Sequence, residues 1–273
     1  MLKKRLIFTL FYDQGAFMLS RNFRLQKVGN MDWLQNNYNF SKVAFSIDEL
    51  IVLDVSRTKR DLHEFCRNLK TLSQGCFVPI AAGGGVRSIE DAKILLRSGA
   101  DKIVINTPLF ETPLLITELS AEFGQQCIVA SIDAKLETGA GYQVRIKNGS
   151  HCMEGTLGDW IKKLARYPVG DLYLNSMDRD GTGQGYDMDI LGELPDDLPM
   201  PLILSGGAGH YNHLSQGLSD KRVDAVATGH LFNFLGDGLE RSRMELINKG
   251  FHLPLWDHLR AKGLKNLYSG NAH

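Results

Sequence analysis

Residues 78–110 read VPIAAGGGVRSIEDAKILLRSGADKIVINTPLF, and this stretch has the pattern of one complete βαβ unit. The runs Val78–Ala82 and Lys102–Ile105 predict two short strands, and Ser88–Ser98 between them predicts a helix. Apolar residues follow one another in these runs rather than alternating with polar ones, which is typical of parallel strands buried on both faces. The stretch therefore predicts an α/β fold with a parallel sheet.

The same alternation of strand-like and helical segments continues along all 273 residues. The other strand-like runs are Leu6–Phe11, Glu49–Leu53, Cys127–Ile132, Asp171–Asn175, Pro201–Leu204 and Asp224–Ala227. The other helical stretches include Asp61–Leu72, Pro113–Phe123, Leu157–Tyr167 and His210–Leu218. Such a series of eight units matches a closed (β/α)8 barrel of roughly 250 residues. We therefore predict a single TIM barrel over residues 1–250 and a C-terminal extension over residues 251–273.

Two segments interrupt this alternation. Glu137–Glu154 contains Asn148-Gly149 between two short β-prone runs, which predicts a hairpin after the fifth barrel strand. Phe11–Asn30 is a long connection after the first strand, and we interpret it as a mobile loop over the site.

The composition excludes several classes of protein. Apolar residues make up 43% and charged residues 23% of the chain, which is typical of a soluble globular protein and not of a disordered one. The 31 basic and 31 acidic residues balance, so we expect neither nucleic acid nor a membrane as a partner. The four cysteines lack metal-ligand spacing, and no targeting or membrane-spanning segment is recognisable, which predicts a cytoplasmic protein. We find no signature of a metal site or an organic cofactor.

An internal repeat divides the predicted barrel into two similar halves of four units each. Asp54 precedes Gly83-Gly84-Gly85 by almost the same distance that separates Asp178 from Gly206-Gly207. ADKIVINTPLF at 100–110 and VDAVATGHLFNF at 223–234 then follow the two glycine runs at matching distances.

Each half therefore offers a possible phosphate cradle, because glycine turns and unpaired backbone N–H groups at strand ends can approach a phosphate closely. One cradle consists of Gly83–Gly85 with Asn106 and Thr107. The other consists of Gly206, Gly207, Gly209, Thr228, Gly229 and His230, with Asp180-Gly181-Thr182 nearby. Two such cradles predict a ligand with a phosphate at each end. The alternative is that these glycines only form tight turns.

The fifth strand ends in VASIDAK and places Asp133 at the predicted barrel mouth, whereas the equivalent position of the first strand is Phe11. Two facing carboxylates could act as a general acid and base, but a phenyl ring carries no transferable proton. Asp13, two residues beyond Phe11, could replace that carboxylate only if the strand end were remodelled.

Six segments together resemble the cyclase subunit of imidazole glycerol phosphate synthase over roughly residues 1–250. They are DELIVLDVS, IAAGGGVRS, SGADKIVINT, FGQQCIVASIDAK, SMDRDGTGQGYD and LILSGGAG. The resemblance implies a barrel that docks a glutaminase on its N-terminal face. It also implies that ammonia passes through the barrel core to a bisphosphate at the C-terminal face.

The resemblance also assigns roles to individual residues. It implies that Asp133 is one of two catalytic aspartates and that Asp101 faces the glutaminase. It implies one phosphate site at Gly84, Gly85, Asn106 and Thr107, and a second at Asp180, Gly181, Gly206, Gly207, Gly229 and His230. It implies an ammonia gate formed by Arg5, Glu49, Lys102 and Asp171. His230 and Asp171 stand where the family usually has serine and glutamate.

Two departures bear on the reaction: Phe11 replaces the other catalytic aspartate, and Leu19 replaces a loop lysine near the substrate. The pattern resembles divergent paralogues that pair with a glutaminase and an ATP-dependent amidotransferase to form acetamidino groups on surface-polysaccharide sugars. We therefore predict an ammonia-relaying barrel subunit that has lost cyclase chemistry. The alternatives are a working cyclase of histidine biosynthesis that uses Asp13 or a water, and a non-catalytic barrel that binds a bisphosphate.

Overall fold

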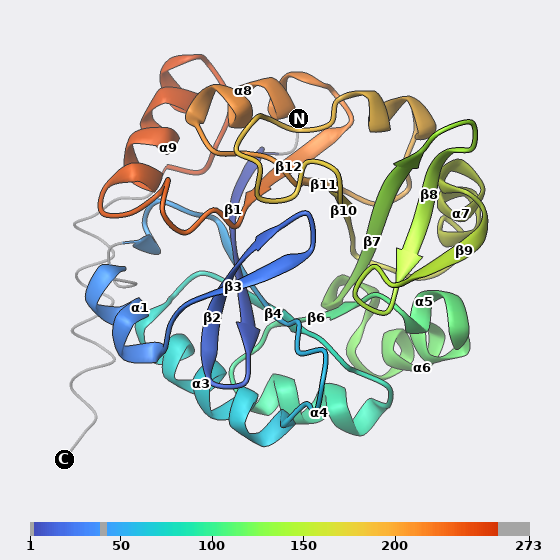
Figure 1. Ribbon diagram of the computed structural model, residues 1–273, viewed down its shortest axis with the longest axis horizontal. Helices are drawn as coiled ribbons and strands as arrows, with labels where there is room; N and C mark the ends of the chain where they lie inside the picture. Colours follow the sequence, from blue (N-terminus) through green and yellow to red (C-terminus); the bar gives the residue numbers. More distant parts are fainter. Residues whose placement is uncertain (1–2, 39–42, 256–273) are drawn as a thin grey trace.

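The computed structural model describes residues 3–38 and 43–255, and parallel strands in it close into a barrel (Figure 1). The barrel strands are β1 (Arg5–Asp13), β4 (Glu49–Asp54), β5 (Ile80–Gly83), β6 (Lys102–Ile105), β7 (Ile128–Glu137), β10 (Asp171–Ser176), β11 (Leu202–Ser205) and β12 (Val223–Thr228). Each is paired in parallel with its neighbour in this order, β12 pairs with β1, and β7 pairs with β10. The predicted TIM barrel is confirmed, and each predicted strand run overlaps one of these strands.

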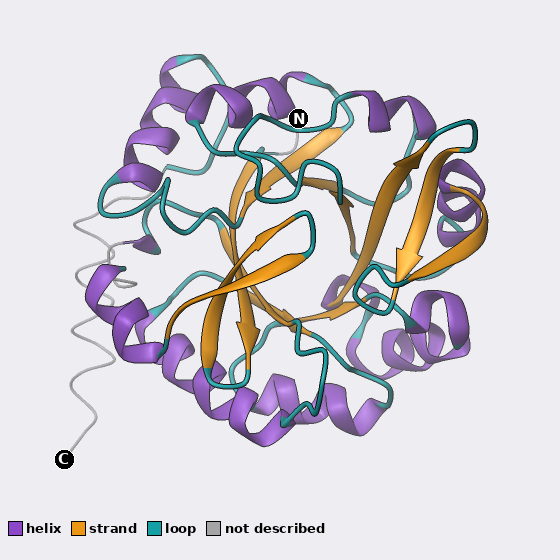
Figure 2. Cartoon of the chain, in the orientation of Figure 1, coloured by secondary structure: helices purple, strands orange, loops and turns teal. Residues whose placement is uncertain are grey.

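Helices cover the outside of the barrel (Figure 2). They are α1 (Met31–Asn37), α3 (Leu62–Gly75), α4 (Ile89–Arg97), α5 (Pro108–Glu111), α6 (Leu114–Phe123), α7 (Leu157–Leu164), α8 (Tyr211–Ser219) and α9 (Gly238–Asn248), with short 3₁₀ turns at η1 (Gln125–Cys127) and η2 (Asp189–Glu193). Several begin at a side chain that accepts a hydrogen bond from the first helical turn: Asp61 for α3, Ser88 for α4 and Thr156 for α7. None of the described helices is long and apolar enough to cross a membrane.

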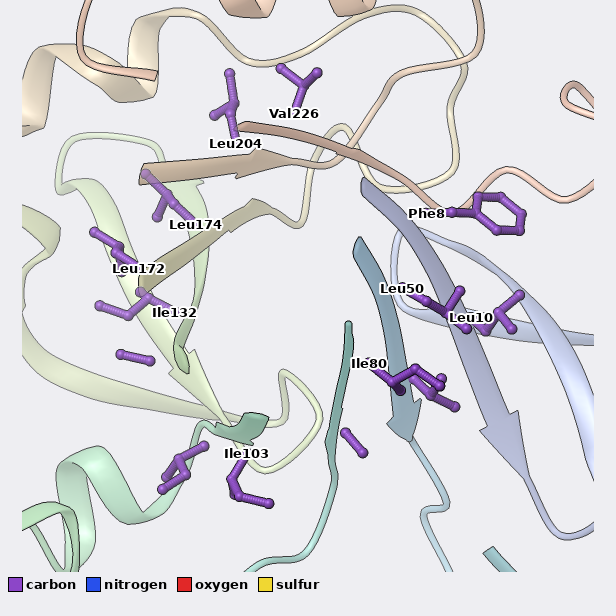
Figure 3. Close-up of a cluster of buried hydrophobic side chains, with 14 of the residues drawn as sticks. Phe8, Leu10, Leu50, Ile80, Ile103, Ile132, Leu172, Leu174, Leu204 and Val226 are labelled. Carbon is purple, nitrogen blue, oxygen red and sulfur yellow. The ribbon is translucent and has the colours of Figure 1, made fainter. Parts of the chain in front are cut away.

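Apolar side chains pack on both faces of the barrel strands, as their continuous apolar sequences predicted. The larger cluster lies between strands and helices and includes Phe8, Leu10 and Leu50 (Figure 3). A smaller cluster fills the barrel interior and consists of Ile7, Ile51, Ala81, Val104, Val129, Tyr173, Ile203, Ala225 and Ala227. Because one cluster lies outside the barrel wall and the other inside it, consecutive residues of one strand are both buried.

The predicted hairpin after the fifth strand is present. β7 continues beyond the barrel and pairs with β8 (Gly141–Ile146), which pairs with β9 (His151–Thr156). Lys147, Asn148 and Gly149 in the connecting turn have φ values of 53°, 56° and 78°, which asparagine and glycine adopt at low cost.

The prediction of a loop over Phe11–Asn30 was wrong, because this segment forms a second hairpin. β1 continues past the barrel mouth and pairs with β2 (Ala16–Arg21), which pairs with β3 (Arg24–Gly29). Asn22 and Phe23 connect β2 to β3 with φ values of 49° and 63°. Asparagine in a two-residue turn is a hairpin signal, so the sequence contained this information. Figure 1 shows β2 and β3 crossing in front of the barrel strands.

A buried ion pair joins the last described helix to the barrel floor. Arg243 on α9 donates hydrogen bonds to both carboxylate oxygens of Asp48 at 2.9 and 3.0 Å, and both residues are less than 10% exposed. Asp48 also accepts a hydrogen bond of 2.8 Å from the backbone N–H of Leu6 on β1. The predicted extension begins just beyond α9, and its residues 256–273 lie outside the described residues.

We expect Arg243→Met to lower the free energy of unfolding by about 3–5 kcal/mol, because it leaves the buried Asp48 carboxylate without its counter-ion. The matched control is Arg241→Met on the same helix, since Arg241 pairs with Asp237 in an exposed position. That control should leave stability nearly unchanged. Denaturant unfolding of both variants measures the difference, and equal small losses would contradict a structural role for the buried pair.

Candidate functional site

A cavity of about 400 Å³ opens at the carboxyl ends of the barrel strands. Parallel pairing brings the ends of the barrel strands to one rim. β1, β4, β6, β7 and β10 contribute lining residues, and so does the turn after β5. The β2–β3 hairpin supplies Ser20, Phe23 and Leu25 as one wall, and the β8–β9 turn supplies Lys147, Asn148 and Ser150. Both chain segments that interrupt the barrel pattern therefore help to enclose the cavity.

Asp133 lies in this cavity between two amide side chains. Asn106 Nδ2 donates a hydrogen bond to Asp133 Oδ2 at 3.1 Å, and Asn175 Nδ2 donates one to Asp133 Oδ1 at 2.9 Å. Burial raises the pKa of Asp133 to about 6, although both amide hydrogen bonds favour the charged form. A carboxyl group with this pKa can exchange a proton near neutral pH.

Phe11 also lines the cavity and occupies the strand end that corresponds to Asp133 in the other half. A Cβ atom on Gly229 would lie 2.9 Å from the Phe11 Cε2 atom, so the ring packs directly against the Gly229 backbone. Asp13, the alternative proton carrier, ends β1 and is not among the residues that line the cavity. Asp133 is thus not paired with a second carboxylate from β1.

Leu19 lies in the middle of β2, where successive side chains point to opposite faces. Ser20 lines the cavity and Leu19 does not. Leu19 is therefore on the opposite face of the hairpin from the cavity.

The first group of predicted phosphate-binding residues lies together on the cavity wall: Gly84, Gly85, Asn106 and Thr107. Gly84 has a φ of 111°, and a Cβ atom at this position would lie 2.1 Å from the carbonyl oxygen of Asp54. Only glycine fits this turn, because any side chain would collide with the backbone at the end of β4. The turn keeps backbone groups at the cavity surface.

The second group of predicted phosphate-binding residues is placed differently. Asp180 lines the cavity, but Gly181, Gly206, Gly207, Gly229 and His230 do not. A Cβ atom on Gly181 would lie 1.8 Å from the carbonyl oxygen of Ser20, so this glycine allows the hairpin to approach closely. The structure therefore does not bring both predicted phosphate groups into one cavity, and phosphate binding by the second group stays a prediction.

Asp180 holds the β2–β3 hairpin against the barrel. Its carboxylate accepts hydrogen bonds from Ser20 Oγ at 2.5 Å and from the Phe23 backbone N–H at 2.9 Å. Its carbonyl oxygen accepts a third from the Asn22 backbone N–H at 2.8 Å. Burial raises the pKa of Asp180, while these hydrogen bonds to the carboxylate lower it. Two hydrogen bonds from the turn and one from β2 fix the hairpin over the cavity.

At the opposite rim, the four predicted gate residues form one closed ring of ion pairs, which we call the floor ring: Arg5, Glu49, Lys102 and Asp171. Each is the first residue of its strand, so parallel pairing brings all four to the same end of the barrel. Arg5 contacts Glu49 at 3.1 Å and Asp171 at 2.6 Å, and Lys102 contacts the same two carboxylates at 3.0 and 2.8 Å. The ring is neutral.

The two carboxylates of the floor ring have different surroundings. Burial raises the pKa of Glu49, and its Oε1 atom has no hydrogen-bond partner among the described residues. Burial acts in the same direction on Asp171, but the charges of Arg5 and Lys102 outweigh it and lower the pKa of this residue. The ring therefore contains one unused hydrogen-bond acceptor, Glu49 Oε1.

Asp101, predicted to face a glutaminase, lies on the same rim as the floor ring. Its Oδ2 atom accepts a hydrogen bond of 2.8 Å from the Ile80 backbone N–H at the start of β5, and its side chain remains exposed. The position agrees with a surface at the N-terminal face, while the contact with a partner stays a prediction.

Three arginines in the cavity wall were not singled out from the sequence: Arg57, Arg60 and Arg87. They belong to the loops that follow β4 and β5. Only their position in loops after barrel strands could have indicated them, because such loops lie at the C-terminal face of the barrel. Tyr173 and Asn175 were missed for a different reason, since they lie inside a run that was read only as a strand.

Comparison with known proteins places these features in a family. Residues 35–236 match the family described as histidine biosynthesis protein. A protein of Parasynechococcus marenigrum (strain WH8102), named "Putative imidazole glycerol phosphate synthase subunit hisF2", is 49% identical over 243 residues. The match covers 89% of this chain and 90% of that relative.

We expect the stability difference between the native chain and an Asp133→Asn variant to depend on pH. The carboxyl binds its proton more tightly when folded, with a pKa of about 6 against 3.8, so its contribution is largest below pH 4 and falls as pH rises through 6. The expected fall is about 2–3 kcal/mol. Denaturant unfolding at several pH values measures it.

Asp61→Asn serves as the control, because the contribution of Asp61 to stability should change with pH in the opposite direction. Asp61 is exposed, and its hydrogen bond from the Glu64 backbone N–H lowers its pKa, so its contribution is lost as pH falls. A pH-independent difference for Asp133→Asn would contradict the burial of this carboxyl.

Proposed function

The chain belongs to the histidine biosynthesis protein family, and we propose that it is the barrel subunit of a glutamine-dependent amidotransferase system. It is an imidazole glycerol phosphate synthase-like barrel. In the proposed system it receives ammonia from a glutaminase docked around the floor ring and relays it through the barrel. The observation that carries the proposal is an intact floor ring opposite a mouth in which Phe11 faces the cavity in place of a carboxylate.

The floor ring is suited to admit ammonia because it is neutral and has one unused acceptor. Glu49 Oε1 can accept a hydrogen bond from an entering ammonia molecule without breaking an existing ion pair. A neutral ring of paired charges also opposes the entry of ions, since an ion would disrupt the pairing. Asp101 on the same rim is the proposed contact with the glutaminase.

In this proposal, ammonia moves along the barrel axis from the floor ring to the mouth. Asp171, Tyr173 and Asn175 alternate along β10, so they lie at successive levels of the barrel interior. The interior cluster between the ring and the cavity includes three alanines, Ala81, Ala225 and Ala227, which occupy little volume. The Tyr173 hydroxyl lies 2.6 Å from Ser205 Oγ and 3.4 Å from Thr9 Oγ1 and offers polar atoms midway.

The residues at the cavity mouth support the proposed loss of cyclase chemistry. The cyclase family resembled here uses two carboxylates, whereas only Asp133 remains, and removing a general acid or base typically costs about 10²–10⁴-fold in rate. Ammonia delivered beside Asp133 is then available to another enzyme. We propose that an amidotransferase docked over the mouth transfers a phosphoryl or adenylyl group from ATP to the oxygen of a sugar acetamido group. Ammonia then attacks the amide carbon, the oxygen leaves as phosphate or AMP, and an acetamidino group is formed. This assembly would work in the cytoplasm on surface-polysaccharide precursors.

A second candidate is a working cyclase of histidine biosynthesis. It is favoured by the description of the family, by the name of the relative, and by the retention of Asp133 with Asn106 and Thr107 in one cavity. In this case a water molecule would have to carry the proton that Phe11 cannot.

Turnover of the cyclase family's bisphosphate by the purified chain with excess ammonium salt separates the two candidates, because free ammonia replaces any glutaminase. We expect turnover at least about 100-fold below that of a cyclase with both carboxylates. Phe11→Asp should raise the rate. Phe11→Asn should not, because asparagine has the shape of aspartate but no carboxyl group to transfer a proton. Rapid turnover by the unmodified chain would establish the cyclase and refute the loss of chemistry.

Ammonia relay is tested in a complex of the chain with a glutaminase and a sugar amidotransferase, supplied with amide-¹⁵N glutamine and unlabelled ammonium. We expect the acetamidino product to carry mostly ¹⁵N. Arg5→Ala should reduce the labelled fraction, because it opens the floor ring and lets ammonia exchange with solvent. Lys93→Ala, which removes a half-exposed ion pair between α4 and α6, is the control and should leave the fraction unchanged. Equal labelling in both variants would exclude the ring as the ammonia entry.

A further inference from the structure

The cavity at the carboxyl ends of the strands, which we call the mouth cavity, adjoins one of the two predicted phosphate groups more closely than the other. All four residues of the first predicted phosphate group line it, whereas the glycines of the second group and His230 do not. Phe11 packs on Gly229, and the hairpin held by Asp180 packs on Gly181. A ligand in this cavity therefore meets only one of the two predicted phosphate cradles, which disfavours a molecule with a phosphate at each end.

Positive charge gathers on the side of the first cradle. A Cβ atom on Gly85 would lie 2.8 Å from Arg60 Cδ and 3.3 Å from Arg60 Nη1, so this guanidinium adjoins the glycine turn. Arg57 and Arg87 line the cavity from the two loops beside it, and Lys147 lines it from the β8–β9 turn. Four cations from three loops lie beside one cradle, and one of them, Lys147, is paired with Glu111 at 2.6 Å.

The acidic residues of the cavity cancel only part of this charge. Asp180 is held by the hairpin, and Asp133 is hydrogen-bonded by two amides, with a pKa of about 6. Asp54 contacts Arg60 at 3.8 Å, and Arg60 Nε has no hydrogen-bond partner among the described residues. Arg57 donates to the carbonyl oxygen of Phe23, a neutral group, and for the exposed Arg87 guanidinium the described part of the chain contains no ion pair.

The cradle can bind one phosphate through backbone N–H groups, and the arginine guanidinium groups beside it can bind a second through paired hydrogen bonds. Two anionic groups would then lie next to each other at one end of the ligand. Phe23 and Leu25 of the β2–β3 hairpin add apolar side chains to the lining, and Asp133 and Asn175 line the cavity as well. The volume of about 400 Å³ lies in the range of small-molecule sites.

We propose that the mouth cavity binds an organic diphosphate of the kind found in nucleotide-activated sugars, with the diphosphate between the Gly84-Gly85 turn and Arg57, Arg60 and Arg87. The sugar then lies toward Asp133, where relayed ammonia emerges. This inference rests on the proposed function for the identity of the sugar, but ligand binding can be measured without any ammonia transfer.

Calorimetric titration of the full chain tests the inference with UDP-N-acetylglucosamine, inorganic pyrophosphate, fructose 1,6-bisphosphate and N-acetylglucosamine. We expect UDP-N-acetylglucosamine to bind best, pyrophosphate more weakly, and fructose 1,6-bisphosphate more weakly than either, because its phosphates are at opposite ends. N-acetylglucosamine alone should not bind measurably.

The combined variant Arg57→Ala/Arg87→Ala should weaken binding of UDP-N-acetylglucosamine about 10- to 100-fold. Lys221→Ala, which removes one positive charge on an 82% exposed side chain after α8, is the control and should bind normally. Both arginines are exposed, so their removal should not affect folding.

Three results would overturn the inference: no binding of UDP-N-acetylglucosamine, tighter binding of fructose 1,6-bisphosphate, or equal affinity of the arginine variant. Pyrophosphate binding as tight as that of the nucleotide sugar would exclude recognition of the organic part. If UDP-N-acetylglucosamine does not bind but ¹⁵N is still transferred from glutamine, only this inference is rejected. Normal binding without ¹⁵N transfer would reject the relay and leave the ligand assignment in place.

Discussion

Closure of the barrel by parallel pairing is the constraint on which the other features depend. Because β1 pairs with both β12 and β4, and β7 pairs with β10, every barrel strand starts at one rim and ends at the other. Charged residues that begin four strands therefore meet as the floor ring, while residues that end strands meet around the cavity. Two sites with different chemistry arise at opposite ends of one molecule without a second domain.

The mouth of this barrel differs between the two halves of the internal repeat. In one half the strand end presents Asp133 between two amides, and in the other it presents Phe11 against Gly229. The β2–β3 hairpin, joined to Asp180 by three hydrogen bonds, adds to this difference. The two halves of the repeat therefore contribute differently to the cavity.

Much of this architecture was predictable from the sequence. Continuous apolar runs alternating with helical stretches predicted the barrel strands, and Asn148-Gly149 predicted the β8–β9 hairpin, because these signals depend on neighbouring residues only. Membership of the family was also carried by local segments such as IAAGGGVRS. The β2–β3 hairpin was missed, although Asn22 marks its turn, since its strands lack a strong alternating pattern.

The sequence by itself determined the order of the strands, the residues at their ends and the absence of a carboxylate at Phe11. Only the tertiary structure decided which of those residues share a cavity. Gly181 and Gly229 belong to phosphate-like glycine turns in the sequence, yet the space beside them is filled by Ser20 and Phe11. Such packing depends on contacts between segments far apart in the chain, and no local pattern of residues encodes which side chain occupies a given volume.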